Sequence, residues 1–291
     1  MNSVTNYTEE MSKKINRYLY LMSLENIEKY NNGYKPDLGP INNQVLEDGR
    51  IPVWVCWWQG LENAPEVVKK CVESIKRNIP EEKSKLIVIT IDNYMNYIGF
   101  SETIVNRFNS GAISLTHLSD ILRMQLLYMY GGMWIDATCY INDKRIREAF
   151  KYEFYTVKAG LPTWKGDVHA RGRWTVSFMV AQKGNPLCGF INDMFELYFN
   201  TREDMLDYFL LDRFVLIAYE NITQIREMMD KCPSNNKDIL KLVDYMNEPY
   251  NENIYANLKN NTYVFKLTYK QKMMEKTNQG EDTFYKCLIT G

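Results

Sequence analysis

The sequence predicts an α/β fold with a helical extension before the sheet and helical additions after it. Two compact apolar runs, at 51–58 and 86–91, flank a helical pattern at 65–78. Strand, helix and strand in that order imply parallel pairing. A long apolar helix at 115–130 then leads through two glycines into a further strand at 133–136. The chain has 291 residues, enough to bury a substantial core.

The first 49 residues are predicted to form a helix and a linker. Between residues 5 and 31, apolar side chains such as Met11, Ile15, Leu19 and Met22 recur near helical spacing. Residues 31–50 are rich in Asn, Gly, Pro and Asp, as in loops. The helix fits two interpretations, packing on the main domain or contact with a membrane surface or partner, and we favour packing. Residues 50–291 are expected to form the main domain, with helical additions after about residue 185.

The ends of the first two strands mark a ligand site. Gln59-Gly60 ends the first strand, and the second ends at Asp92. Parallel sheets bind ligands at the carboxyl ends of their strands. We therefore expect Trp57, Trp58, Gln59, Asp92 and residues 93–94 where a nucleotide would lie. Later elements are predicted as a loop at 160–174, a strand at 175–181, and helices near 187–200 and 203–220.

Composition excludes several classes of protein. Lys and Arg total 35 against 36 Asp and Glu, so no overall positive field favours nucleic acid. No apolar run approaches the roughly 18 residues of a membrane span, and no secretory signal is evident, so a cytoplasmic location is expected. The six cysteines form no CxxC pair, which favours reduced thiols. With two histidines outside any zinc motif, a metal would be bound by oxygen.

The most informative stretch is SDILRMQLLYMYGGMWIDATCY, residues 119–140. Asp120 and Arg123 share one face of a helix, either as part of a site or as an exposed ion pair. Gly131 and Gly132 turn the chain sharply and allow close approach to a ligand. Asp136 then emerges at the end of a strand. A carboxylate there can hold a divalent cation that neutralises a diphosphate.

This stretch resembles glycosyltransferase family 32 and its capsular polysaccharide synthesis branch, and more distantly the clostridial glucosylating toxins. The shared pattern is S-D-x-x-R followed by G-G-x-x-x-D. The resemblance continues in IPVWVCWWQG, PEVVKKCVESIKRN, FMVAQKGNP and KLTYK, and covers about two thirds of the chain in order. It implies a GT-A-like, Rossmann-like nucleotide-sugar-binding domain.

The resemblance also assigns roles to residues. Trp57, or alternatively Trp58, would border the nucleotide base, and Asp120 with Arg123 would grip the donor sugar. Gln59, Asp92, Gly131 and Gly132 are expected around the nucleotide. Asp136 and Thr138 would hold Mn²⁺ or Mg²⁺, although Thr138 stands where the family's D-x-D motif has its second Asp. A threonine hydroxyl is the weaker cation ligand, so loose binding is expected.

Cations and aromatic residues elsewhere complete the expected site. Lys266 and Lys270 of KLTYK, with Arg171 and Arg173, are candidates to neutralise the leaving diphosphate. The loop WKGDVHARGRW, 164–174, fits either an acceptor site or an ordinary surface loop. Asp212-Arg213 fits either an acceptor contact or a structural pair, and we favour the structural pair.

The resemblance implies a retaining transfer of a hexose from a nucleoside diphosphate, expected to be UDP, to an oligosaccharide or lipid-linked glycan. The setting would be bacterial capsular or surface polysaccharide synthesis, in the cytoplasm or at the inner face of the membrane. No nucleophile elbow or Ser-His-Asp set argues for a separate nucleophile. The rival hypotheses are a non-catalytic nucleotide-sugar or carbohydrate-binding module and a nucleotide-sugar hydrolase.

Overall fold

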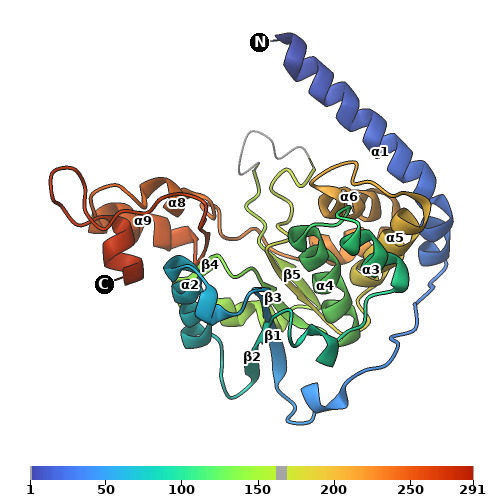
Figure 1. Cartoon of the computed structure of the whole chain (residues 1–291), viewed down its shortest axis with the longest axis horizontal. Helices are drawn as coiled ribbons and strands as arrows, with labels where there is room; N and C mark the ends of the chain where they lie inside the picture. The colour runs from blue at the N-terminus through green and yellow to red at the C-terminus, as the bar shows by residue number, and fades with distance from the viewer. Residues whose placement is uncertain (1, 162–168, 291) are drawn as a thin grey trace.

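A five-stranded mixed sheet forms the centre of the protein (Figure 1). The computed structural model describes residues 2–161 and 169–290. The strand order is β2 (Ser84–Ile89), β1 (Ile51–Cys56), β3 (Gly132–Ile135), β6 (Phe178–Ala181) and β5 (Phe154–Thr156). Strand β1 pairs in parallel with β2, as predicted, and also in parallel with β3, whereas β6 and β5 are antiparallel additions. The α/β class predicted from the sequence is confirmed.

Strand side chains alternate between two hydrophobic cores, one on each face of the sheet. Trp54, Trp134 and Met179 lie in one core with α4 (Leu115–Met129), α5 (Pro186–Thr201) and α6 (Leu210–Asn221). Their neighbours in sequence, such as Val53 and Met133, lie in the other core with α2 (Glu66–Asn78). Successive residues of a strand point to opposite faces, so these buried runs serve both layers.

A short second sheet covers part of the α2 face. It pairs β4 (Cys139–Ile141) with β7 (Val264–Lys266) in antiparallel register, and Cys139 lies opposite Lys266. The short helices α8 (Lys241–Tyr245) and α9 (Glu252–Asn261) precede β7 in the chain. The sequence did not predict this ribbon, because its two strands are short and lie far apart along the chain. The ribbon places Lys266, which lies late in the sequence, next to the end of β3.

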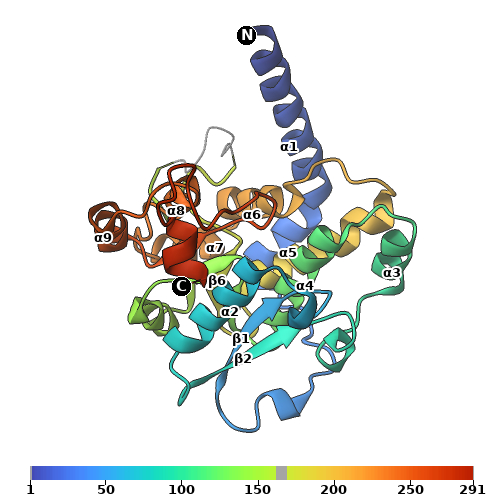
Figure 2. The same cartoon turned by 60° about the vertical axis from the view of Figure 1, so that its left-hand side comes forward.

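Helix α1 (Asn2–Asn31) packs on the main domain from Ser12 onward, while its N-terminal end projects from the body (Figures 1 and 2). Leu19 and Tyr30 are buried, and the Tyr30 hydroxyl donates to Asp193 of α5 over 2.9 Å. Arg213 of α6 donates to the Asn16 side chain. Packing, the favoured interpretation, is thus confirmed for this part of the helix. Among the described residues, no helix is long and apolar enough to cross a membrane.

Several boundaries differ from the sequence predictions. Helix α6 begins at Leu210 rather than near 203, because the Asp207 side chain accepts a hydrogen bond from the Phe209 amide and stabilises a turn there. Strand β6 begins at Phe178, three residues later than predicted. Helices α3 (Glu102–Asn109) and α7 (Thr223–Asp230) and strand β5 were not predicted.

Two glycines join α4 to β3 at a place where the backbone is crowded. Gly131 and Gly132 have φ values of 69° and 98°, in the region that disfavours L side chains. A Cβ on Gly132 would lie 2.2 Å from the Pro52 carbonyl oxygen of β1, and one on Gly131 would lie 2.6 Å from the Lys183 amide nitrogen. The glycines therefore allow β3 to lie close to β1.

We expect Gly132→Ala to lower the free energy of unfolding by about 2 kcal/mol more than Gly184→Ala, measured by urea denaturation. Gly184 is the matched control, since its φ is also positive, at 75°, but a Cβ there meets nothing within 4 Å. Both variants carry backbone strain, and only Gly132→Ala adds overpacking. Equal losses in the two variants would contradict this account of the junction.

Candidate active site

A cavity of about 860 Å³ opens at the carboxyl ends of β1 and β3. Among the described residues that line it are residues at the end of β1 (56–59), on α4 (119, 120 and 123), at the end of β3 (136–138), in the segments 169–177 and 208–212, and from β7 onward (266–271). The position agrees with the strand-end site expected from the sequence.

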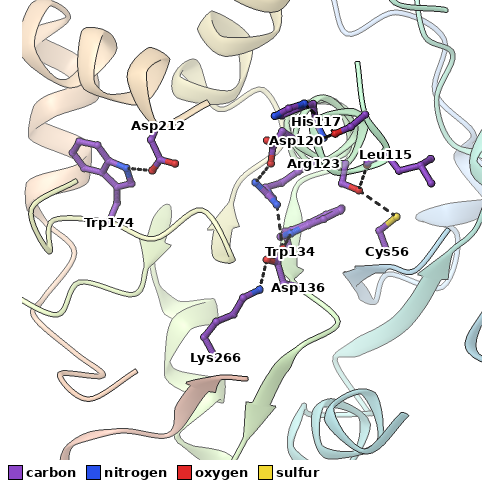
Figure 3. Close-up of polar contacts among 12 residues, drawn as sticks. Cys56, Leu115, His117, Asp120, Arg123, Trp134, Asp136, Trp174, Asp212 and Lys266 are labelled. Atoms are coloured by element: carbon purple, nitrogen blue, oxygen red, sulfur yellow. Dashed lines mark hydrogen bonds and ion pairs between the residues drawn. The ribbon is translucent and has the colours of Figure 1, made fainter. Parts of the chain in front are cut away.

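Four residues, which we call the charged cluster, form a chain of alternating charge in this cavity: Asp120, Arg123, Asp136 and Lys266 (Figure 3). Arg123 donates to Asp120 Oδ1 over 2.9 Å and to Asp136 Oδ1 over 3.1 Å. Lys266 Nζ lies 2.5 Å from Asp136 Oδ2. Three elements, α4, β3 and β7, meet in these contacts.

Local periodicity explains how α4 and β3 present their side chains to each other. Asp120 and Arg123 are three residues apart on α4 and so share a face. Trp134 and Asp136 are two residues apart and lie on one side of β3. The Trp134 indole donates to Asp136 Oδ1 over 2.8 Å, and the Arg123 guanidinium lies over the Trp134 ring, 4.9 Å from its centroid. Trp134 was not among the predicted site residues, although its spacing from Asp136 could have indicated it.

The pair Asp120 and Arg123 is not an exposed ion pair. The side chain of Arg123 is only 4% exposed and that of Asp120 only 14%. A buried guanidinium needs anionic partners, and here it has two. The structure thus rejects the alternative of a solvated surface pair and places both residues in the cavity wall.

The cluster shifts the pKa values of its members in opposite directions. Burial raises the pKa of Asp120 to about 7, with a further rise from the charges of Asp136 and Asp212 and an opposing effect from Arg123. Burial acts in the same sense on Asp136, but Lys266 and Arg123 outweigh it and hold the pKa of Asp136 below its usual range. Asp120 therefore titrates near neutral pH, whereas Asp136 stays ionised.

The two tryptophans at the end of β1 have different surroundings. Trp58 is buried and its indole donates to the Leu115 carbonyl oxygen and to Ser119 Oγ, over 2.9 and 2.8 Å, which ties β1 to α4. Trp57 is half-buried and meets the Tyr269 ring edge to face at 5.2 Å. Both line the cavity, as does the exposed Gln59. Trp57 is thus the better placed of the two to border a flat ring.

Aromatic and polar residues form the opposite part of the cavity. The Trp174 indole donates to Asp212 Oδ1 over 3.0 Å, and His169, Tyr208 and Phe209 line the same region (Figure 3 shows the Trp174–Asp212 pair). From the sequence, the loop 164–174 fitted either an acceptor site or an ordinary surface loop. Positions 169–174 are described and contribute His169 and Trp174, and 164–168 lie outside the described residues.

The neighbours Asp212 and Arg213 differ in their surroundings. Asp212 faces the cavity. Arg213 is buried, forms an ion pair with Asp207, and donates to the Ser12 carbonyl oxygen of α1 over 3.2 Å. The favoured structural interpretation therefore holds for Arg213 and not for Asp212.

Some residues predicted for the site lie away from the cavity. Asp92 is exposed after β2 and is not among the described lining residues. Gly131 and Gly132 lie at the start of β3, the opposite end from Asp136, and protein backbone fills the space beside them. Arg173 donates to the His169 and Ala170 carbonyl oxygens and covers the Trp174 and Tyr219 rings. Arg171 likewise lies outside the described lining.

The residues expected to hold a divalent cation are a poor set of metal ligands. Asp136 and Thr138 both line the cavity, and Thr138 is buried. All three donors to Asp136 belong to Arg123, Trp134 and Lys266, so both carboxylate oxygens already have protein partners. In the described ranges no group of three His, Cys, Asp or Glu residues could hold a metal ion. These residues do not fit a protein-built metal site.

Among the described residues that line the cavity, Cys56 carries a thiol. Burial raises the pKa of the Cys56 thiol to about 12, and the Asp136 charge adds to this rise. A thiol with such a pKa stays protonated at neutral pH and is a weak nucleophile. Covalent catalysis by Cys56 is therefore disfavoured.

Several known proteins resemble this chain. Glycosyltransferase afumC of Aspergillus fumigatus is 29% identical over 100 residues, 32% of this chain and 26% of the relative. O-glycosyltransferase braB of Annulohypoxylon truncatum is 28% identical over 96 residues, 31% of this chain and 23% of the relative. The matched stretches thus span about a quarter of these longer proteins. The solved PaToxG Glycosyltransferase is 13% identical, with a TM-score of 0.40 over 74% of this chain and 82% of that chain.

A family match covers far more of the chain than these relatives do. The model of the family described as "Capsular polysaccharide synthesis protein" matches residues 4–288. This range includes the whole cavity, the charged cluster and most of α1. The chain belongs to the capsular polysaccharide synthesis protein family.

Proposed function

We propose that this protein is a glycosyltransferase. Its donor is a nucleoside-diphosphate sugar, specifically a UDP-hexose, and it moves the hexose to a glycan acceptor. The observation that carries the proposal is the charged cluster, in which Arg123 and Lys266 flank the Asp136 carboxylate inside a large cavity at the strand ends. Family membership and the similarity to fungal glycosyltransferases support it. A GT-A arrangement and kinship with glycosyltransferase family 32 are part of the proposal.

The cavity offers a separate place for each part of such a donor. Trp57 and Gln59 at the end of β1 suit a base and ribose, since aromatic faces stack on flat rings. Lys266 and Lys270 suit the diphosphate, because cations neutralise phosphate oxygens. Asp120 and Arg123 lie deeper along the cluster and suit the hydroxyls of the donor sugar.

The proposed reaction exchanges one bond to the anomeric carbon for another. The bond from this carbon to the diphosphate oxygen breaks, and a bond to the acceptor hydroxyl oxygen forms. The departing diphosphate takes the hydroxyl proton on the same face, which retains the anomeric configuration. Lys266 and Arg123 stabilise the charge that grows on the leaving group. No protein nucleophile is required, in keeping with the protonated Cys56 thiol.

The acceptor is proposed to enter beside Trp174 and Asp212. An aromatic ring beside a carboxylate suits sugar rings and their hydroxyls, and Tyr208, which is 57% exposed, also lines the cavity. An oligosaccharide or a lipid-linked glycan has this chemistry. The setting that we propose is bacterial capsular or surface polysaccharide synthesis, in the cytoplasm and at the inner face of the membrane.

The direct test is incubation of the protein with a panel of nucleotide sugars and oligosaccharides. Release of UDP that rises when an acceptor is added supports a transferase. Tight binding of nucleotide sugar without turnover would instead support a binding module. Free sugar released at equal rates with and without acceptor would support a hydrolase.

We expect Asp136→Asn to lower kcat/KM by ~10²–10³-fold, because it removes the carboxylate that organises both cations of the cluster. Asp92→Asn is the matched control, since Asp92 also follows a strand of the sheet but is exposed and outside the described lining. Its kcat/KM should stay unchanged. Circular dichroism checks that both variants fold. Near-normal turnover of folded Asp136→Asn would refute the assignment.

The pKa of Asp120, about 7, predicts a pH dependence. The ionised carboxylate pairs with Arg123 and accepts hydrogen bonds from sugar hydroxyls, so kcat/KM should rise as the pH rises through 7. Asp120→Asn should lower kcat/KM by about 10- to 100-fold and remove this inflection.

The raised pKa of Asp120 also predicts how the stability of the protein depends on pH, which is measured independently of activity. Its native pKa lies above the ordinary 3.8, so the folded protein binds this proton more tightly than the unfolded chain does. The free energy of unfolding should therefore fall as the pH rises from 3.8 toward 7, and Asp120→Asn should flatten that fall. Urea denaturation at several pH values measures it. An unchanged slope in the variant counts against the shifted pKa.

We expect Asp212→Asn and Trp174→Phe to lower transfer to the acceptor by about tenfold, because the first removes the carboxylate charge of the proposed acceptor surface and the second removes its indole donor. Slow hydrolysis of the donor, measured without acceptor, should stay the same, since the charged cluster is intact. The ratio of the two rates in one preparation separates an acceptor defect from misfolding. Parallel losses of both activities would contradict an acceptor role.

A further inference from the structure

Lys266 occupies the side of Asp136 at which a divalent cation would bind. Its Nζ lies 2.5 Å from Asp136 Oδ2, while Oδ1 accepts from Arg123 and Trp134 (Figure 3). A cation bound to Oδ2 would approach to about 2.0–2.6 Å, and the ammonium already fills that position and repels a second positive charge.

The backbone holds Lys266 in this place. Lys266 lies opposite Cys139 in the β4–β7 ribbon, and the Leu267 amide donates to the Thr138 carbonyl oxygen over 2.8 Å. The Cys139 amide in turn donates to the Asp136 carbonyl oxygen over 2.8 Å. The paired backbones therefore fix the Lys266 backbone beside Asp136, and a metal that displaced the ammonium would have to break its ion pair with Asp136 Oδ2.

The donor capacity of Lys266 suits a diphosphate. An ammonium carries three N–H donors, and Asp136 accepts from one of them. The side chain is 27% exposed and lines the cavity, so the other donors can reach a bound ligand. Arg123 lies on the other oxygen of the same carboxylate. Two fixed cations thus stand where the chemistry requires positive charge.

We propose that Lys266 takes the place of the divalent cation, so that this protein binds nucleoside diphosphate and transfers sugar without Mn²⁺ or Mg²⁺. The inference rests on the proposed function, because it concerns the diphosphate of that same donor. It also accounts for Thr138, since a site that holds an ammonium has no use for a second carboxylate ligand.

The first experiment measures the Kd of UDP by calorimetry with the wild-type protein, once in EDTA and once in excess Mn²⁺. We expect the two values to agree within about twofold. Sugar transfer in EDTA should likewise match transfer in Mn²⁺. Binding of UDP in Mn²⁺ alone overturns the inference and leaves the proposed function in place. Absence of UDP binding in both conditions overturns the proposed function as well.

Variants test the role of the ammonium itself. Lys266→Met keeps the length of the side chain and removes its charge, and it should weaken UDP binding and transfer by ~10²–10³-fold. Lys266→Arg should retain part of the activity. Lys272→Met is the matched control, an exposed lysine of the same segment outside the described lining, and should behave as wild type. Equal behaviour of Lys266→Met and wild type overturns the inference.

A gain-of-function variant gives the converse test. Thr138→Asp combined with Lys266→His offers a cation two carboxylates and an imidazole in place of an ammonium. We expect Mn²⁺ to tighten UDP binding to this double variant by about tenfold, and to leave the wild type unaffected. The same response to Mn²⁺ in both proteins would show that Lys266 does not exclude the metal.

Discussion

The Asp136 carboxylate joins the two halves of the protein. Its Oδ1 is bonded to Arg123 of α4 and to Trp134 of β3, and its Oδ2 to Lys266 of β7. Helix α4 belongs to the core on one face of the sheet, and β7 to the core on the other. Asp136 is half-buried, but Arg123 is almost fully buried, and removal of the Asp136 carboxylate would take away one of the two anionic partners of this buried guanidinium. The Asp136 side chain therefore links α4 and β7 at the cavity.

The chemistry of the cavity follows from this arrangement. The cations that neutralise Asp136 are the groups that a diphosphate would meet, so the contacts that stabilise the fold also prepare the site for charge. Asp120 lies at the end of the same chain, where burial and neighbouring carboxylates raise its pKa to about 7. Across the cavity, the pair of Trp174 and Asp212 offers an aromatic and polar surface instead. The two walls suit two different substrates.

The elements that the sequence predicts correctly are those whose pattern is local. Strand, helix and strand over 51–91 appear as β1, α2 and β2 with small shifts of boundary, and α4 ends at Met129, one residue before the predicted end. Asp120, Arg123 and Asp136 were predicted together and lie in contact. Asp92, Gly131 and Gly132 were predicted for the ligand site, yet Asp92 points to solvent and the glycines face backbone. A motif does not reveal which neighbours fill the space around it.

The sequence by itself determined the α/β class, the helix that carries Asp120 and Arg123, and the strand that ends at Asp136, because each depends on periodicity within a few turns or strand residues. Only the tertiary structure decided that Lys266, 130 residues from Asp136, lies on its second oxygen. That contact depends on the register of β4 with β7, a pairing between distant segments with no local signal. The tertiary structure also decided that Asp212 faces the cavity, whereas its neighbour Arg213 contacts α1.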